Sequence, residues 1–95
     1  MRVIRGSSDA ETAGIWEGMH SRRLPQDIQP VARRKLRMLN SSATLEDLRV
    51  PPGNRLEALC GDRKGWYSIR INDQWRICFR WRDGNAFDVA IGDYH

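Results

Sequence analysis

The sequence has little cysteine and histidine and no long run of apolar residues. Its 95 residues include two cysteines, Cys60 and Cys78, and two histidines, His20 and His95, none at the spacing of a zinc or redox motif. So few cysteines make no disulfide framework, and we expect buried, reduced thiols in a cytoplasmic protein. No apolar stretch is long enough for a membrane span, and the charged N-terminal residues do not fit a secretory signal. We therefore expect a single domain over residues 1–95, with no metal and no membrane contact.

Phosphate-binding glycine motifs are also missing. The eight glycines are scattered along the chain, and none of them opens a helix directly after a strand. A nucleotide-binding loop or a dinucleotide-binding fold needs such a glycine at the start of a helix. We therefore expect no nucleotide or other cofactor.

Arginine dominates the charged residues that are present. The chain has 16 basic and 12 acidic residues, a formal net charge of +4, and 14 of the 16 basic residues are arginine. Because a guanidinium binds a phosphate through two parallel hydrogen bonds, nucleic acid is the first partner class to consider. The alternative is an ordinary surface with a mild excess of basic residues.

The first half of the chain has mostly helical patterns. After a short strand candidate at Met1–Arg5, Ser8 and Glu11 fit a capping box that opens a helix over Asp9–His20. Asp27 is expected to cap a second helix with Pro30 in its first turn. The buried stripe of this helix is predicted to be Ile28, Ala32, Leu36 and Leu39, and the other side to be basic, with Arg33, Arg34, Lys35 and Arg37.

From Arg55 onward, apolar and polar residues alternate as they do in half-buried strands. A three-residue loop at Asn72–Gln74 keeps the apolar residues of two strands on one face and sets Arg70 opposite Arg76. A loop of the same length at Asp83–Asn85 sets further pairs opposite each other, which are Trp81 and Phe87, Phe79 and Val89, Ile77 and Ile91, and Arg80 and Asp88. The pattern predicts an α+β domain in which helices pack on the apolar face of an antiparallel sheet.

The opposite face of this sheet is predicted to carry Arg70, Arg76 and Arg80. Arg70 and Arg76 repel each other when they are directly opposed, so a group outside the sheet should neutralise them. A bound phosphate is one interpretation. The alternative is that Asp88, Asp93 and the terminal carboxylate neutralise the arginines within the chain.

The last three residues, Asp93, Tyr94 and His95, are expected to end beside that face, because Gly92 should lie opposite Arg76. A guanidinium, an imidazole, a phenol and a carboxylate would then meet. Metal-independent RNA cleavage requires such a set, namely a base, an acid and a cation that stabilises the phosphorane. The alternative is a solvated chain terminus without a catalytic role.

Several stretches together resemble one known family. They are the segment Pro51–Glu57, the turn Gly61–Arg63, the strand Trp66–Arg70, the hairpin Asn72–Ile77 and the ending Asp93–His95. In combination they are similar to the HigB branch of the RelE-like toxins, also called plasmid maintenance killer proteins. The resemblance covers nearly the whole chain.

This resemblance implies a small RelE-like fold, with two N-terminal helices on one face of an antiparallel sheet that is mixed at one edge. It implies the toxin of a type II toxin–antitoxin pair, which enters the ribosomal A site and cleaves translated mRNA by metal-independent 2′-hydroxyl attack without a cofactor. The implied partners are the ribosome with bound mRNA and a HigA-like helix-turn-helix antitoxin, which would make the contact with operator DNA.

The resemblance also implies roles for residues at matching positions. Arg76 would stabilise the transition-state phosphate, and Asp93, Tyr94 and His95 would supply the acid–base and orienting groups. The assignment of general base and general acid stays open, although we favour His95 in proton transfer and Tyr94 in positioning. The expected RNA-binding residues are Arg55, Arg63, Lys64, Arg70 and Arg80.

Two positions depart from this family pattern. Many relatives carry a histidine where Glu57 stands and a basic residue where Cys60 stands. Either Arg55, Arg63 or Lys64 supplies the missing charge, or the enzyme is slower. A different class of function, a non-catalytic module whose arginines bind RNA or an acidic protein, also stays open at this point.

Overall fold

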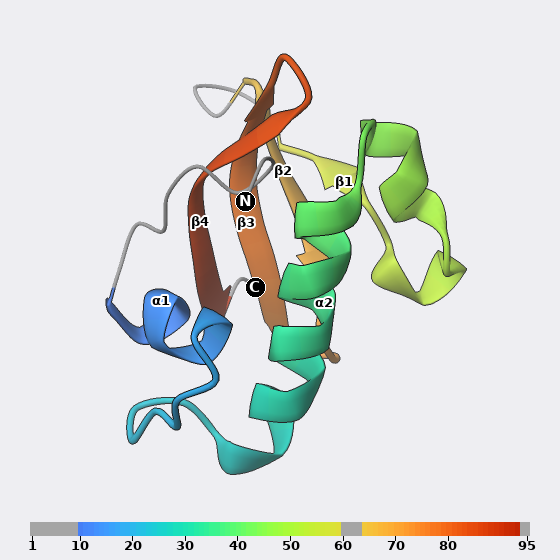
Figure 1. Ribbon diagram of the computed structural model, residues 1–95. Coiled ribbons are helices and arrows are strands. Elements are labelled where there is room, and N and C mark those ends of the chain that lie inside the picture. Colours follow the sequence, from blue (N-terminus) through green and yellow to red (C-terminus); the bar gives the residue numbers. More distant parts are fainter. Residues whose placement is uncertain (1–9, 60–63, 94–95) are drawn as a thin grey trace.

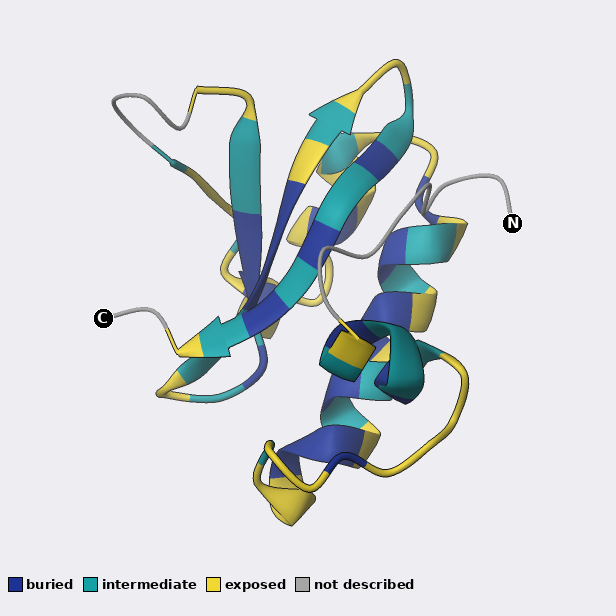
Figure 2. Ribbon diagram, turned by 90° about the vertical axis from the view of Figure 1, so that its left-hand side faces the viewer, coloured by how far each residue is buried: buried dark blue, intermediate teal, exposed yellow. Residues whose placement is uncertain are grey.

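The computed structural model describes residues 10–59 and 64–93, in which the helices lie on one face of a four-stranded sheet (Figures 1 and 2). The expected α+β class is confirmed. All pairings between the described strands are antiparallel. The strand expected at Met1–Arg5 and the capping residue Ser8 lie outside the described residues. The elements in order are helix α1 (Ala10–Trp16), the 3₁₀ turn Gln26–Ile28, helix α2 (Gln29–Ser41), the 3₁₀ segments Leu45–Arg49 and Pro52–Asn54, and strands β1 (Glu57–Ala58), β2 (Trp66–Arg70), β3 (Trp75–Arg82) and β4 (Asn85–Asp93).

Helix α1 is shorter than the sequence pattern suggests. The pattern predicts a helix over Asp9–His20, but α1 ends at Trp16. Gly18 adopts a left-handed φ of 88°, and the amides of Gly18 and Met19 donate hydrogen bonds of 3.0 and 2.8 Å back into the last turn. This pair of bonds is the usual way in which a glycine closes a helix. The glycine thus ends the helix rather than weakening its interior.

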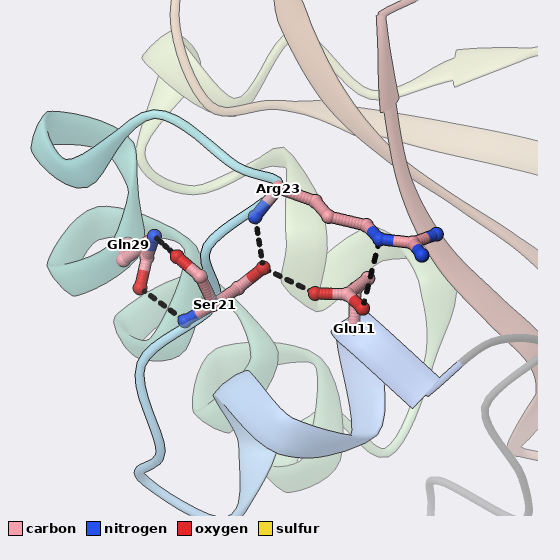
Figure 3. Close-up of polar contacts among 4 residues, drawn as sticks. All are labelled: Glu11, Ser21, Arg23 and Gln29. Carbon is pink, nitrogen blue, oxygen red and sulfur yellow. Dashed lines mark hydrogen bonds and ion pairs between the residues drawn. The ribbon is translucent and has the colours of Figure 1, made fainter.

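Ser21 fixes the loop between the two helices (Figure 3). Its Oγ donates a short hydrogen bond to Glu11 of α1 and accepts one of 3.1 Å from the amide of Arg23. Its amide donates to Gln29 Oε1 at 3.0 Å, and its carbonyl accepts from Gln29 Nε2 at 2.8 Å. Because Ser21 and Gln29 are both buried, these bonds satisfy polar groups that would otherwise be costly. They tie the start of α2 to α1.

Helix α2 has the buried stripe that the sequence predicts. Its four members, Ile28, Ala32, Leu36 and Leu39, are at most 2% exposed. The prediction that Asp27 caps the helix is wrong, because the 3₁₀ turn Gln26–Ile28 runs directly into α2 and Ile28 takes the N-cap position without a side-chain hydrogen bond.

Lys35 departs from the basic side of α2 on which the sequence places it. It is only 7% exposed, and its Nζ donates a 2.6 Å hydrogen bond to Asn54 Oδ1. The amide group of Asn54 in turn donates to the carbonyl of Leu48 at 3.1 Å. Burial lowers the pKa of Lys35, and the nearby charges of Arg34 and Arg70 lower it further. The Lys35–Asn54 hydrogen bond therefore joins α2 to the turn before β1, and it does so with a buried charge that is costly to keep.

The lowered pKa predicts how stability depends on pH. Because the unfolded chain holds the Lys35 proton more tightly than the folded chain, the protonated amine disfavours folding at neutral pH, and this cost fades as the pH rises through the ordinary value of 10.5. The free energy of unfolding of the wild type, relative to Lys35→Met, should therefore rise from about pH 8 to about pH 11. Urea unfolding at both pH values measures this difference. Lys64→Met, at an exposed position, is the control. If the difference in free energy of unfolding between the wild type and Lys35→Met were the same at both pH values, the prediction would be contradicted.

The hairpin between β2 and β3 has the predicted register. Arg70 lies opposite Arg76, as a three-residue loop requires. Asn72 Oδ1 accepts hydrogen bonds from the amides of Gln74 and Trp75, at 2.9 and 2.7 Å. These bonds add to the backbone hydrogen bonds that the amides of Ile71 and Asn72 donate to the carbonyl of Trp75, at 2.8 and 3.2 Å. An asparagine side chain commonly stabilises a turn in this way.

The hairpin between β3 and β4 differs from the prediction near its tip. Arg82 pairs with Asn85, so the loop contains only Asp83 and Gly84, both with left-handed φ of 52° and 76°. Such values define the tight turn that the right-handed twist of a hairpin favours. A two-residue loop shifts the register by one residue, so the expected pairs near the tip are wrong. Trp81 lies opposite Ala86, and Phe87 lies opposite Arg80.

A β-bulge restores the predicted register farther along β4. Asp88 has a φ of 53°, and the register shifts between Cys78 and Arg80 of β3. One extra residue on β4 is thereby absorbed. Ile77 then lies opposite Ile91, as predicted.

The core lies between the helices and the facing side of the sheet (Figure 2). The buried sheet residues on this side are Ile69, Ile71, Ile77, Phe79, Ala86, Val89 and Ile91. Thr12 of α1 also joins β4, because its Oγ1 accepts a 2.9 Å hydrogen bond from the amide of Ile91. None of the helices in the described part of the chain is long and apolar enough to cross a membrane.

Candidate functional site

The sheet face opposite the helices presents three rows of side chains, which we call the arginine face. Strand register defines the rows, because residues two apart on a strand point to the same side. The first row is Arg70, Arg76 and Gly92, the second is Glu57, Ser68, Cys78 and Ala90, and the third is Trp66, Arg80 and Phe87. The predicted placement of Arg70, Arg76 and Arg80 on one face is confirmed.

Arg76 is the most tightly held of these arginines. Its Nε donates to Ser68 Oγ at 2.8 Å, and its Nη2 donates to the carbonyl of Arg55 at 2.7 Å and that of Ser68 at 3.3 Å. Its Nη2 also lies 3.2 Å from Glu57 Oε1, and 15% of its side chain is exposed. These contacts fix the orientation of the guanidinium. A preoriented guanidinium can stabilise charge on a phosphate with little reorganisation.

The backbone of Arg55 contributes to this site as well as its side chain. The 3₁₀ turn Pro52–Asn54 ends at Arg55, which adopts a left-handed φ of 45°. This conformation is costly for a non-glycine residue and is enriched at functional sites. It places the Arg55 carbonyl against Arg76. The sequence predicts only the RNA-binding side chain, which is exposed, because no pattern signals this backbone conformation.

Glu57 is a site residue that sequence reasoning singled out only as a departure from the family pattern. It lies on β1 opposite Ser68, and its carboxylate forms the ion pair with Arg76. The Glu57 side chain is 63% exposed. A carboxylate so exposed to water holds its partner weakly. The two-residue strand β1 is too short for its register to be predicted from hydrophobic alternation.

The other two arginines also have carboxylate partners within the chain. Arg70 forms a short ion pair with Asp73, whose side chain is 96% exposed, and Arg80 pairs with Asp88 at 2.7 Å, with both side chains 48% exposed. The alternative interpretation, neutralisation within the chain, is therefore confirmed for Arg80 and Asp88. The partner of Arg70 is Asp73, which the alternation of the strands does not indicate. Each carboxylate is exposed enough for a phosphate to replace it.

The predicted acid–base residues of the chain end are only partly described. Gly92 lies opposite Arg76, as predicted. Asp93 lies opposite Trp75, and its Oδ2 accepts a 2.8 Å hydrogen bond from Gln74. The register thus turns Asp93 toward the sheet face on which Trp75 lies, the face opposite that of Arg76. Tyr94, His95, Arg63 and Cys60 lie outside the described residues, so their predicted roles stay predictions.

Two further expectations concern Cys78 and Lys64. Cys78 is 2% exposed and lies beside Ser68, which is 1% exposed, so the prediction of a buried thiol is confirmed for this cysteine. Lys64 is exposed at the end of the arginine face near Arg80. Within residues 10–59 and 64–93, no group of three or more His, Cys, Asp or Glu side chains could hold a metal ion.

Comparison with known proteins identifies a family. The family described as RelE-like toxin of type II toxin-antitoxin system HigB matches residues 15–95. Toxin HigB-1 of Vibrio cholerae serotype O1 is 48% identical over 70 residues, which cover 74% of each chain. An uncharacterized protein of Haemophilus influenzae is 39% identical over 72 residues, or 76% of this chain and 70% of the relative. Endoribonuclease HigB of Proteus vulgaris is 42% identical over 41 residues, or 43% and 45% of the two chains.

These matches confirm the family that the sequence motifs suggest. The matched region includes α2, the whole sheet and every residue of the arginine face. With the fold and the matched length in agreement, the chain belongs to the HigB family of RelE-like toxins of type II toxin–antitoxin systems.

Proposed function

We propose that this toxin is a ribosome-dependent endoribonuclease that cleaves translated mRNA in the ribosomal A site. Membership of the toxin family and the name of the Proteus vulgaris relative support nuclease activity. The observation that carries the proposal is the preoriented guanidinium of Arg76, which Ser68 and the Arg55 carbonyl hold and which pairs with the exposed carboxylate of Glu57. That is the arrangement expected for a group that receives a phosphate.

The proposed reaction uses the RNA's own 2′-hydroxyl. The 2′-oxygen attacks the adjacent phosphorus while a base takes its proton, and the bond from phosphorus to the 5′-oxygen breaks as an acid protonates that oxygen. The products carry a 2′,3′-cyclic phosphate and a 5′-hydroxyl. Arg76 stabilises the charge on the phosphorane, Tyr94 and His95 supply the acid–base groups, and Asp93, on the other face of β4, serves as an orienting group.

RNA binding is proposed to use the side chains around this centre. Arg55, Lys64, Arg70 and Arg80 of the described residues, with Arg63, would contact phosphates. Because such contacts release counterions, the affinity should fall with salt. The ribosome would supply the geometry of the bound mRNA, which explains how so small a chain presents RNA for in-line attack.

A toxin of this class has an antitoxin as its partner. We propose that the antitoxin is a HigA-like helix-turn-helix protein and that it makes the contact with operator DNA. Translating ribosomes place the target in the cytoplasm, where we expect the toxin to act as a single domain over residues 1–95.

The ion pair at the centre of the site predicts a gain from one conservative substitution. Glu57→Gln removes the charge that competes with a phosphate for Arg76 while it keeps the side-chain shape. We expect the KM for ribosome-bound mRNA to fall, by up to about fivefold, because exposed ion pairs are worth at most about 1 kcal/mol. Initial rates of cleavage at varied concentrations of programmed ribosomes measure this.

The matched control is Glu46→Gln, which breaks the exposed ion pair with Arg49. It should leave both kcat and KM unchanged. A large drop in kcat for Glu57→Gln at unchanged KM would contradict the competitor role and would instead make Glu57 a proton acceptor.

Primer extension on a reporter mRNA in a reconstituted translation reaction tests the proposed function. Wild-type protein should produce cuts in codon phase that require ribosomes. Cuts on naked RNA would mean a free ribonuclease, which contradicts ribosome dependence. No cuts under either condition would favour the non-catalytic binding module.

A further inference from the structure

The third row of the arginine face is built differently from the first. Trp66 of β2 lies opposite Arg80 of β3, which lies opposite Phe87 of β4. The guanidinium carbon of Arg80 is 5.9 Å from the centre of each ring. The row therefore carries a cation between two aromatic rings on the sheet side opposite the helices. Both rings are partly exposed.

A pocket with a volume of about 280 Å³ adjoins this row. It is lined by Lys64, Gly65, Arg80, Trp81, Arg82 and Phe87. Lys64 is exposed, and the Arg82 side chain is 80% exposed. Asp88 pairs with Arg80, and Asp83 lies 3.8 Å from Arg82, so two exposed carboxylates offset part of the charge. Aromatic faces beside exposed cations form a surface that suits a nucleotide, with its flat base and anionic phosphate.

The row lies at a useful distance from Arg76. Arg80 is four residues along β3 from Arg76, which corresponds to roughly 13 Å at about 3.3 Å per residue. The side chains between the two rows on β2, β3 and β4 are short, namely Ser68, Cys78 and Ala90. Ser68 and Cys78 are 1% and 2% exposed, so an RNA strand that joins the two rows would pass over the side chains that cover them, among them Arg76, which contacts Ser68.

We propose that the Trp66–Arg80–Phe87 row is a stacking platform for one mRNA base about two nucleotides from the phosphate that Arg76 holds. Lys64 and Arg82 contact the phosphate next to that base. This inference rests on the proposed function, because it assigns a further part of the same substrate. Every base has an aromatic face, so the platform positions the mRNA strand and contributes little to codon choice.

The test combines a variant of the platform with a scan of the mRNA. Ribosomes are programmed with mRNA that carries a 2′-deoxynucleotide at the cut, and a single abasic nucleotide is moved through the positions on both sides of it. The Kd of the toxin is measured for wild type, Phe87→Leu and the ring-preserving control Phe87→Tyr. Trp66→Leu is a second variant, and thermal unfolding verifies that all variants fold.

We expect Phe87→Leu to weaken binding of intact mRNA by about tenfold and Phe87→Tyr to change it little. One abasic position, about two nucleotides from the cut, should weaken wild-type binding by a similar factor. At that position Phe87→Leu should cause no further loss, because the base that it would stack is absent.

Absence of such coupling at every mRNA position would overturn the platform. The same holds if Phe87→Leu weakens binding to ribosomes equally with and without mRNA, which would indicate contact with ribosomal RNA. Coupling without any cleavage of ordinary mRNA by wild-type protein would support the platform and refute the proposed nuclease. Cleavage of ordinary mRNA without such coupling would support the proposed nuclease and refute the platform.

Discussion

Arg76→Ala is expected to lower the rate of mRNA cleavage on the ribosome by about 10²–10³-fold, the usual loss when a preoriented donor to a developing oxyanion is removed. The wild-type side chain is fixed by Ser68 and the Arg55 carbonyl before substrate arrives. Its effect should therefore fall mainly on kcat. Single-turnover cleavage of programmed ribosomes measures the rate directly, and a pelleting assay measures binding.

Arg76→Lys is the informative companion variant. Lysine keeps the charge but lacks the planar donors that contact both Ser68 and Arg55, so we expect an intermediate rate. The free energy of unfolding must be compared for each variant, because Arg76 also joins β3 to the turn before β1. Equal losses of cleavage and ribosome binding in Arg76→Ala would favour the non-catalytic module, and a rate within a few-fold of wild type would remove Arg76 from the mechanism.

His95→Ala is expected to reduce cleavage by about 10²–10⁴-fold while ribosome binding is retained, because general acid–base groups contribute on this scale. An imidazole with an ordinary pKa of about 6.5 changes charge within the range in which ribosomes can be assayed. The plot of the wild-type cleavage rate against pH should therefore change slope in this range. The residual rate of His95→Ala should show no such change of slope. Single-turnover rates from about pH 5.5 to about pH 8 give both profiles.

His20→Ala is the matched control for that experiment. His20 is exposed in the loop after α1, on the helix side of the molecule, and belongs to no row of the arginine face. Its loss should leave the rate and the pH profile unchanged. A His95→Ala enzyme with normal kcat would show that proton transfer depends on another group, of which Tyr94 and Glu57 are the candidates.

Hydrophobic patterning predicts the parts of this fold in which a regular period continues without interruption. The stripe Ile28 to Leu39 of α2 and the register of Arg70 against Arg76 follow from periods of 3.6 and 2 residues. The family itself could be identified because motifs over the whole chain are read together.

Local backbone choices explain what the sequence could not predict. The tight turn at Asp83 and Gly84 and the bulge at Asp88 compensate for each other, so the hydrophobic pattern on both sides of them fits either loop length. The shorter loop matters for the site, because it sets Phe87 rather than Asp88 opposite Arg80 and so creates the aromatic third row.

Two further contacts, one buried and one at the sheet edge, could not be predicted from the hydrophobic pattern of the sequence. Lys35 has the sequence environment of an exposed residue, and its burial depends on Asn54, which lies 19 positions away. Glu57 meets Arg76 only because a two-residue strand attaches to the edge of the sheet. Contacts of this kind depend on tertiary structure and leave no periodic signal.

The chemical structure of the cut ends tests the central claim most directly, that the arginine face promotes attack by the 2′-hydroxyl on ribosome-bound mRNA. Mass spectrometry of the fragments should identify a 2′,3′-cyclic phosphate and a 5′-hydroxyl. A single 2′-deoxynucleotide at the cut should abolish cleavage there while the toxin still binds. A 3′-hydroxyl with a 5′-phosphate, or undiminished cleavage at the deoxynucleotide, would contradict this mechanism.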